Sequence, residues 1–307
     1  MIPTPSGSLG APPEPLLSDT QFRELRDFLY RRSGLFFSDT KKFLLESRLQ
    51  KRLRALELDS AEEYLARLRS PARCGREVLE LLDVVTTHET SFFRNRPQLE
   101  AFRRHALPEV LRLQRQRGSR LLRIWSAGCS SGEEPYSLAM LVLEALGDEA
   151  SRWKVQILGT DIARSALEQA ERAVYSSYSF RNAPAYYVQK YFEHDTPQTL
   201  RLKEEPKRLV RFGLLNFADD LRMRAMKGFQ VIFCRNALIY FDREAKRRFV
   251  AHFARALDPG GYFFIGHAES LHGISDAFKL VHFAGALGYR KPLPPSADKE
   301  VPWAQTA

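Results

Sequence analysis

The chain has 307 residues, of which 44% are hydrophobic and 27% are charged. This length and apolar fraction predict one large and one small globular domain with an ample core, and they exclude a largely disordered chain. The cysteines, Cys74, Cys129 and Cys234, show no C-x-x-C spacing, which argues against a zinc site or a disulfide framework and fits a reducing cytosol. Residues 1–10 lack the pattern of a secretory leader, and the longest apolar stretch, 138–146, is short. We therefore expect a cytoplasmic protein without membrane insertion.

The formal net charge is +10 at pH 7, which suits nucleic acid, an anionic membrane or an acidic protein as a partner. The sequence contains no zinc-finger spacing, no aromatic RNA-recognition signature and no basic low-complexity arm. We therefore expect no nucleic-acid partner. A diffuse basic surface is the simplest alternative to a specific acidic partner.

The first part of the chain is predicted to be a disordered tail, residues 1–17, followed by an all-helical domain over 18–95. Five prolines among small residues are typical of a flexible tail. Capping-box spacings that start at Ser18 and Ser60, together with leucines at helical spacing, predict helices near 19–32, 39–56, 61–69 and 76–85. No strand pattern precedes residue 120.

The helix expected over 39–56 has an apolar face and a basic face. Its leucines recur at positions 45, 49, 53 and 56. Lys51 and Arg52 follow Arg48 by three and four residues, and the three side chains are expected to share a solvent-facing stripe. The stripe is a candidate binding surface, although the ordinary surface of a soluble helix explains it equally well.

Residues 86–94 read Thr-Thr-His-Glu-Thr-Ser-Phe-Phe-Arg and follow the fourth helix. Their polar groups could face a ligand while Phe92 and Phe93 anchor the segment, although composition alone would make it only a connector. An arginine-rich helical pattern over 97–116 then leads to the next element.

The stretch from Leu121 to Leu138 predicts a strand, a glycine-bearing turn and a helix that begins at Pro135. Doubly wound α/β folds hold a cofactor at such a turn. The G-x-G-x-x-G spacing is absent, however, and Glu133 and Glu134 would repel a pyrophosphate. A cationic ligand without phosphate, such as S-adenosylmethionine, is therefore favoured over a dinucleotide.

A second acidic position follows the next strand. The strand predicted at 154–160 ends at Asp161, whose carboxylate could accept hydrogen bonds from both hydroxyl groups of a ribose. Each feature also has a simpler explanation, because the two glutamates could merely favour a helix dipole and Asp161 could be a helix N-cap. All three acidic residues together favour cofactor binding.

The remaining chain continues to alternate between helix and strand. After a helix at 163–173 and a tyrosine-rich stretch, residues 199–211 alternate enough to form short strands, so we expect an inserted β-subdomain over about 184–212. The later elements are predicted as strands over 209–215 and 229–234, a helix over 242–257, a turn at 259–261, a strand over 262–266 and a hairpin-like strand over 280–290. Residues 293–307 are expected to be a second disordered tail.

These elements define an α/β fold class, with a doubly wound, Rossmann-like sheet over 96–292. In an open parallel sheet, the residues just beyond the carboxyl ends of the strands line the binding crevice. We therefore expect convergence of Gly128–Glu134, Asp161, Asn216 and Arg235–Asn236.

A series of short motifs runs through the part of the chain expected to be ordered. It consists of Thr86-Thr87-x-x-Thr90-x-Phe92-Phe93-Arg94, Trp125-Ser126-Ala127, Ser130-x-Gly132-Glu133-Glu134-Pro135-Tyr136-Ser137, Asp161, Asn216, Phe233-Cys234-Arg235-Asn236-x-x-Ile239-Tyr240-Phe241-Asp242 and Gly266-His267-x-Glu269-Ser270. By this series the chain resembles, over about residues 18–290, the chemotaxis receptor protein-glutamate methyltransferases of the CheR family. The resemblance implies the fold of an S-adenosylmethionine-dependent methyltransferase. It also implies transfer of the methyl group to glutamate carboxylates of chemoreceptor helices, with S-adenosylhomocysteine as the second product.

The resemblance assigns roles to individual residues. Arg94 and Tyr240 are expected beside the transferred methyl group, where they would orient the carboxylate or the cofactor without taking a proton. His88 stands where the family usually has asparagine, so a change in its protonation near neutral pH could alter cofactor affinity. With His88, the residues expected to contact S-adenosylmethionine are Thr90, Arg94, Glu134, Asp161, Asn216, Phe217, Arg235 and Asn236. No metal is required.

The partner implied by the resemblance is the cytoplasmic domain of a methyl-accepting chemoreceptor. Its acidic helices would face the basic stripe of Arg48, Lys51 and Arg52. Some family members grip a receptor tether peptide through a glycine-rich loop of the small β-subdomain. This chain has no glycine between Gly159 and Gly213, which favours a member that does not need the tether.

We expect a monomer. Two other functions stay open at this point, namely an S-adenosylmethionine-dependent enzyme that methylates a small molecule or nucleic acid, and a non-catalytic sensor of the cofactor.

Overall fold

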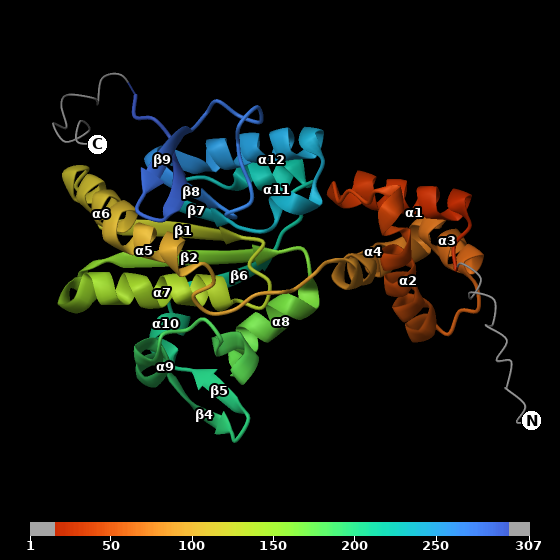
Figure 1. Ribbon diagram of the computed structural model, residues 1–307, viewed down its shortest axis with the longest axis horizontal. Coiled ribbons are helices and arrows are strands. Elements are labelled where there is room, and N and C mark those ends of the chain that lie inside the picture. Colours follow the sequence, from red (N-terminus) through yellow and green to blue (C-terminus); the bar gives the residue numbers. More distant parts are fainter. Residues whose placement is uncertain (1–15, 295–307) are drawn as a thin grey trace, which may run out of the picture.

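The protein consists of a helical N-terminal domain and a larger domain built on a twisted sheet (Figure 1). Its structure is a computed structural model that describes residues 16–294, apart from the side chains of residues 71–73. Most of the tails expected at 1–17 and 293–307 lie outside the described residues. Leu17, however, is fully buried in the core of the helical domain, so the ordered chain begins before residue 18. Among the described residues, no helix has the length and apolar character needed to cross a membrane.

The N-terminal domain is a bundle whose core consists mainly of leucines. Ser18 and Gln21 form the reciprocal capping box predicted there, and Ser60 accepts a hydrogen bond from the backbone N–H of Glu63. The fourth helix begins at Pro71, earlier than the expected start at 76, because proline suits the first turn of a helix. The elements are α1 (Asp19–Ser33), η1 (Asp39–Lys41), α2 (Lys42–Leu56), α3 (Ala61–Arg69) and α4 (Pro71–Val85).

The large domain is organised around a seven-stranded sheet with the strand order β6-β2-β1-β7-β8-β10-β9. Neighbouring strands from β6 to β8 are parallel, whereas β10 is antiparallel to both β8 and β9. This is the doubly wound sheet predicted from the sequence. The strands are β1 (Leu121–Ala127), β2 (Lys154–Asp161), β6 (Val210–Leu214), β7 (Phe229–Cys234), β8 (Leu257–Ile265), β9 (Lys279–Phe283) and β10 (Ala286–Arg290).

The turn expected at 259–261 is instead part of β8. Phe229 pairs with Leu257, and Val231 pairs with Tyr262, so the residues between Leu257 and Tyr262 form an irregular bulge within the strand.

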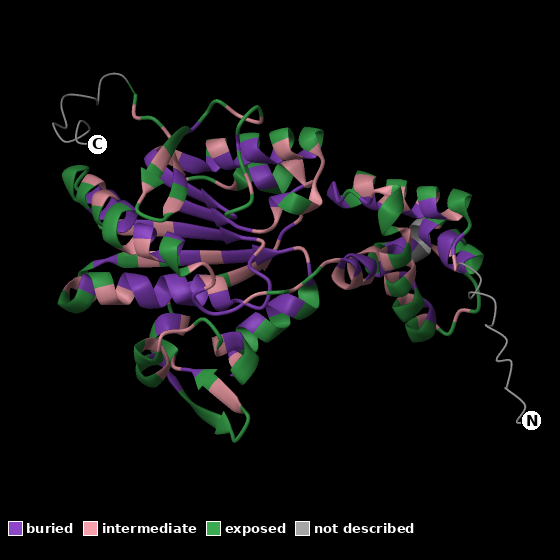
Figure 2. Cartoon of the chain, viewed as in Figure 1, coloured by how far each residue is buried: buried purple, intermediate pink, exposed green. Residues whose placement is uncertain are grey.

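Helices cover both faces of the sheet, because successive residues of a strand point to opposite sides. Val231 and Phe233 of β7 belong to a core that includes α6 and α7, whereas Ile232 and Cys234 belong to a core that includes α11 and α12. Figure 2 shows the buried strands in the middle and the exposed outer surfaces of the helices. The helical elements are α5 (Arg96–Ala101), η2 (Phe102–Ala106), α6 (Leu107–Gln116), α7 (Glu133–Leu146), η3 (Gly147–Arg152), α8 (Arg164–Arg172), α11 (Asp220–Ala225), η5 (Leu238–Tyr240) and α12 (Arg243–Ala256).

A small antiparallel sheet with the strand order β3-β5-β4 projects from the large domain (Figure 1). The expected insertion at 184–212 only partly coincides with it. The small sheet begins with Val174, and residues 210–212 belong to β6, which pairs with β2 of the large sheet. Strand pairing with distant segments decided both limits. The elements are β3 (Val174–Ser176), η4 (Ser177–Phe180), α9 (Ala185–Tyr191), β4 (Phe192–Thr196), β5 (Thr199–Leu202) and α10 (Glu204–Lys207).

The helical domain docks against the carboxyl edge of the large sheet. The hydroxyl group of Tyr30 donates to Oδ2 of Asp242 at 2.9 Å. The backbone N–H of Phe36 donates to the carbonyl of Tyr240 at 2.9 Å. These contacts place the end of α1 and the segment after it directly beside the loop that follows β7.

Candidate functional site

A pocket of about 1030 Å³, including its solvent-open part, lies between the carboxyl edge of the sheet and the helical domain. Ser33 and Leu35 of the helical domain contribute to its wall. The pocket brings together every residue that the sequence placed beside the cofactor or the methyl group: His88, Thr90, Arg94, Glu134, Asp161, Asn216, Phe217, Arg235, Asn236 and Tyr240. Their contacts with a bound molecule remain predictions.

The turn after β1 forms one wall of this pocket. The backbone N–H groups of Gly128 and Cys129 both donate to the carbonyl of Thr160, which ties the turn to the end of β2. Gly132 has a φ of 91°, and a Cβ atom there would lie 2.7 Å from Cβ of Ala170. The following helix, α7, begins at Glu133 and not at Pro135, where the sequence predicted its start.

The two glutamates at the start of α7 have different surroundings. Glu133 is 2% exposed and accepts hydrogen bonds from the hydroxyl groups of Ser131 (2.8 Å) and Ser179 (3.0 Å). Burial raises its pKa, and it does not line the pocket. The expectation that both carboxylates face the ligand is therefore wrong, because successive helical residues point about 100° apart. Of the two glutamates, only Glu134 lines the pocket.

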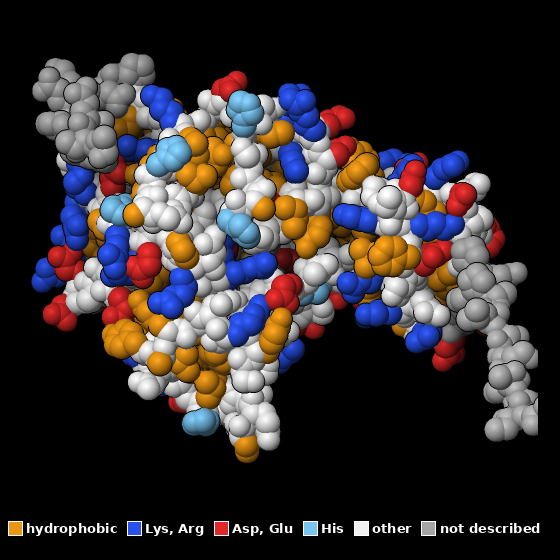
Figure 3. Space-filling view, in the orientation of Figure 1, with side chains coloured by type: hydrophobic (Ala, Val, Ile, Leu, Met, Phe, Trp, Pro, Cys, Tyr) orange, Lys and Arg blue, Asp and Glu red, His pale blue; other side chains and the backbone are white. Residues whose placement is uncertain are grey.

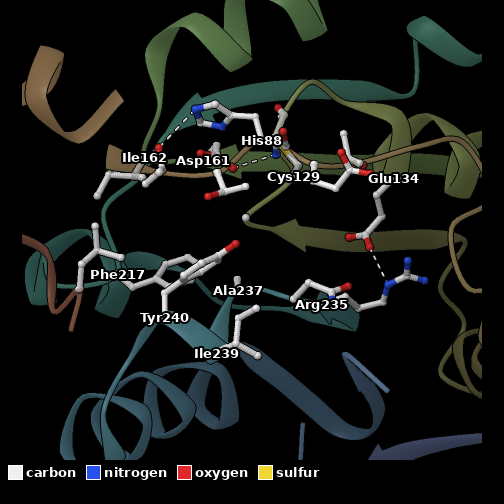
Figure 4. A pocket seen from close by; sticks show the side chains of 18 of the residues that line it. His88, Cys129, Glu134, Asp161, Ile162, Phe217, Arg235, Ala237, Ile239 and Tyr240 are labelled. Atoms are coloured by element: carbon white, nitrogen blue, oxygen red, sulfur yellow. Dashed lines mark hydrogen bonds and ion pairs between the residues drawn. The ribbon is translucent and has the colours of Figure 1, made fainter. Parts of the chain in front are cut away.

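Glu134 is held by two partners, as Figure 4 shows for Arg235. It accepts a hydrogen bond from the hydroxyl group of Ser126 at 2.7 Å, and its Oε2 lies 2.9 Å from Nε of Arg235. Nη2 of Arg235 donates to the carbonyl of Arg94 at 2.7 Å. Nη1 of the same buried guanidinium has no hydrogen-bond partner within the described part of the chain. Burial lowers the pKa of Arg235.

Asp161 ends β2 and is 8% exposed. Its Oδ2 accepts from the N–H of Ser130 at 2.8 Å, and its Oδ1 accepts from the N–H of Ala163 at 3.0 Å. Burial raises the pKa of Asp161 despite these bonds. The N-cap of α8 is Ala163, so Asp161 is not the cap residue. A carboxylate can accept about four hydrogen bonds, so two hydroxyl groups of a ribose could still be accommodated.

The segment before Arg94 is anchored as the sequence predicted. Phe92 and Phe93 are buried, and the ring of Phe92 stacks on Phe180 with centroids 5.1 Å apart. Phe93 and Asn95 have φ values of 56° and 57°, a left-handed conformation that costs energy for residues other than glycine. Nη1 of Arg94 donates to the carbonyl of Glu89 at 2.6 Å. The strained backbone thus presents Arg94 to the pocket.

His88 and Asn216 already have partners within the protein. Nε2 of His88 lies 3.1 Å from the carbonyl of Asp83 at the end of α4. Nδ2 of Asn216 donates to the carbonyl of Arg32 at 2.7 Å, and its Oδ1 accepts from the N–H of Ala218 at 2.9 Å. Asn216 therefore links the sheet to the helical domain.

The basic stripe on α2 is smaller than expected. Arg52 is not solvent-facing: its Nε and Nη2 donate to the two carboxylate oxygens of Glu77 at 2.9 and 2.8 Å. Lys51 is exposed and Arg48 is half-buried. Lysine and arginine side chains are scattered over both domains in Figure 3. Arg52 is instead tied to Glu77 of α4. The sequence shows the spacing of Arg52 on α2, but it does not show which residue of another helix lies opposite.

Glu269 lies in the motif Gly266–Ser270, and the sequence alone indicates no role for it. This half-buried carboxylate accepts hydrogen bonds from the N–H groups of Asn236 (3.1 Å), Ile239 (2.9 Å) and Gly266 (2.5 Å). Its position in a motif without an assigned role was the signal that could have identified it.

The pocket fits a nucleoside that carries a cationic sulfonium. Asp161 offers acceptors to hydroxyl groups of the nucleoside at the end of β2. Nη1 of Arg235 is a buried donor without a hydrogen-bond partner among residues 16–294, and it would suit the carboxylate of the ligand's amino-acid part and not the sulfonium. Residues 88–286 match the family model described as "CheR methyltransferase, SAM binding domain". The sheet, the pocket and this match define an S-adenosylmethionine-dependent methyltransferase.

The helical domain and whole-chain relatives identify the family. Residues 20–86 match the model described as "CheR methyltransferase, all-alpha domain". Chemotaxis protein methyltransferase 2 of Vibrio cholerae is 34% identical, over 94% of this chain and 98% of its own length. Chemotaxis protein methyltransferase 1 of Pseudomonas aeruginosa is 33% identical, with 89% and 98% covered. The chain belongs to the CheR methyltransferase family.

Proposed function

We propose that the protein transfers the methyl group of S-adenosylmethionine to glutamate side chains in the cytoplasmic helices of chemoreceptors, forming methyl esters. The observation that carries the proposal is the presence of Arg94 and Tyr240 on the wall of the same pocket as Asp161. The hydroxyl group of Tyr240 points into this pocket (Figure 4). A cation and a phenol are suited to hold an incoming carboxylate. The relatives are chemotaxis protein methyltransferases, which supports a chemoreceptor as the partner.

The reaction requires positioning more than acid–base chemistry. S-adenosylmethionine supplies a methyl group on a sulfonium that is already activated. An oxygen of the substrate carboxylate forms a bond to the methyl carbon, the carbon–sulfur bond breaks, and its electron pair stays on sulfur. A glutamate carboxylate is ionised at pH 7, so no proton has to be removed. Catalysis then depends on holding the reacting atoms in line at about 3 Å.

We assign this alignment to Arg94 and Tyr240, which both line the pocket. One N–H group of Arg94 donates to the carbonyl of Glu89, which fixes the guanidinium and leaves other donors of its five for the substrate. The Tyr240 backbone is held by the N–H of Phe36 at 2.9 Å. Both side chains would orient the carboxylate without exchanging a proton with it.

The receptor would approach from the side of the helical domain. Arg48 and Lys51 on α2 remain candidates for contact with its acidic helices, because neither forms an ion pair with any described residue. Arg52 is set aside because its guanidinium is committed to Glu77.

The test uses labelled S-adenosylmethionine and a chemoreceptor cytoplasmic fragment, followed by alkali. Label released as volatile methanol identifies a carboxyl ester. Alkali-stable label would indicate methylation of nitrogen or nucleic acid, and no incorporation would indicate a sensor; either result contradicts the proposal. Tyr240→Phe should lower the transfer rate about 100-fold, the scale of a positioning defect. The control Tyr186→Phe removes the hydroxyl group of an exposed tyrosine, which donates a hydrogen bond to Glu144. This variant should keep the wild-type rate.

A further inference from the structure

A single carboxylate, Glu269, connects the end of β8 to the loop after β7. Its Oε2 accepts from the N–H groups of Gly266 (2.5 Å) and Asn236 (3.1 Å), and its Oε1 accepts from the N–H of Ile239 at 2.9 Å. Glu269 itself does not line the pocket described above, whereas Asn236, Ile239 and Tyr240 do. The carboxylate therefore acts on the pocket through the backbone of this loop.

The loop needs such support because its backbone is unusual. Asn236 has a φ of 58°, in the left-handed region, and a short helical turn, η5, follows at Leu238–Tyr240. Gly266 allows the close approach, since a Cβ atom there would lie 2.5 Å from Oε2 of Glu269 and 3.0 Å from the nitrogen of Asn236. Gly266 and Glu269 thus act together, because the absence of a side chain at Gly266 lets the carboxylate of Glu269 reach the loop.

We propose that Glu269 is a positioning residue for methyl transfer, whose ionised carboxylate fixes the 236–240 loop and thereby holds the phenol of Tyr240 in the pocket. The proposal rests on the role given to Tyr240 in the proposed function. On its other side, the same loop is held by the N–H of Phe36, which donates to the carbonyl of Tyr240. Glu269 and the helical domain together define where the phenol lies.

Three donors facing two oxygens make this site selective for a carboxylate. In Glu269→Gln, the single amide oxygen can serve Gly266 and Asn236, but the amide NH₂ group would then face the N–H of Ile239. Two donors would oppose each other, and the segment that leads to Tyr240 would lose its anchor. Protonation of Glu269 in the wild type would have a similar effect, because one oxygen becomes a donor.

The charged and titratable groups around Glu269 are Lys246 on α12, and Arg235 and Cys234 at the end of β7. Burial raises the pKa of Glu269, although its three backbone hydrogen bonds oppose this shift. Loss of the ionised carboxylate on acidification therefore begins at a higher pH than for an ordinary glutamate.

The experiment compares the wild type, Glu269→Gln and Ser270→Ala. Ser270 is an exposed neighbour whose hydroxyl group accepts from the N–H of His272, away from the loop. We expect Glu269→Gln to lower kcat about 10- to 100-fold. Its dissociation constant for S-adenosylhomocysteine should stay within about threefold of the wild type. Ser270→Ala should match the wild type in both.

Two further measurements separate positioning from folding and from the choice of substrate. Amide hydrogen exchange across residues 235–242 should be faster in Glu269→Gln and unchanged in Ser270→Ala, and this readout needs no receptor. In the wild type, kcat should fall on acidification through the raised pKa of Glu269, and Glu269→Gln should lack this step.

The outcomes are distinct. Unchanged exchange and kcat in Glu269→Gln overturn the proposal. A parallel loss of kcat, cofactor affinity and melting temperature would make Glu269 merely structural and also overturns it. A wild-type protein that fails to methylate the receptor fragment contradicts the proposed function, while the exchange result still decides whether Glu269 fixes the loop.

Discussion

Replacing Arg52 with alanine should destabilise the helical domain without removing a receptor contact. Arg52 on α2 and Glu77 on α4 form a two-point ion pair, and their side chains are 12% and 4% exposed. The hydroxyl group of Tyr64 also donates to Glu77, at 2.7 Å. Without Arg52, the carboxylate stays buried with one hydrogen bond and no cation.

The magnitude follows from this burial. Removing one partner of a buried ion pair costs about 3–5 kcal/mol, because the remaining charge is left uncompensated. The hydrogen bond from Tyr64 persists and places Arg52→Ala near the lower end, at about 3 kcal/mol. Lys51→Ala, one residue earlier on the exposed surface, should change stability by at most about 0.5 kcal/mol.

Urea unfolding followed by circular dichroism measures the stability difference. The double variant Arg52→Met with Glu77→Gln should recover most of the loss, since the buried charge is gone and the glutamine oxygen can still accept from Tyr64. The rate of receptor methylation measures the effect on function. Lys51→Glu should lower this rate in a salt-dependent manner, whereas the matched control Lys154→Glu, at the amino end of β2 and far from the pocket, should not.

A stability loss below about 1 kcal/mol in Arg52→Ala, together with a fall in receptor methylation as strong as in Lys51→Glu, would contradict this prediction. Arg52 would then be a receptor contact, and its bond to Glu77 would be incidental.

Two further predictions concern the pocket. Burial raises the pKa of Asp161, so its carboxylate is protonated at a higher pH than usual and loses acceptor capacity. Calorimetry should therefore show weaker binding of S-adenosylhomocysteine as the pH falls through that pKa, with weak and less pH-dependent binding in Asp161→Asn; a flat wild-type profile would contradict this. Gly132→Ala should lower stability by about 1–3 kcal/mol in thermal unfolding, because of its φ of 91° and the 2.7 Å approach to Ala170. Gly75→Ala, in open space on α4, should raise stability by up to about 1 kcal/mol, and equal effects at both positions would argue against backbone strain.

The sequence determined the fold class and the place of the pocket. A nearly continuous apolar run identified β7, because all of its residues are buried. Shorter apolar runs identified β1 and β2, since their amino ends are partly exposed. Parallel strands present their carboxyl ends at one edge, so the polar residues after each strand had to converge there. These inferences need only local pattern and the geometry shared by all such sheets.

The tertiary structure alone decided which charged groups meet. Glu133 and Glu134 are neighbours in sequence, yet helical rotation buries one among serines and turns the other toward Arg235. The limits of the small sheet likewise depended on which distant segments pair. Residues 210–212, which were expected in the small subdomain, belong to β6, and β6 pairs with β2 of the large sheet.

Side-chain contacts between distant segments explain the other differences between the predictions from sequence and the structure. Arg52 meets Glu77 from another helix, and Glu269 reaches back to Asn236 and Ile239 across the end of β7. A side chain's spacing along its own element is fixed by the local backbone, so the sequence reveals it. Its partner is set by how separate elements pack, and that is decided only when the chain has folded.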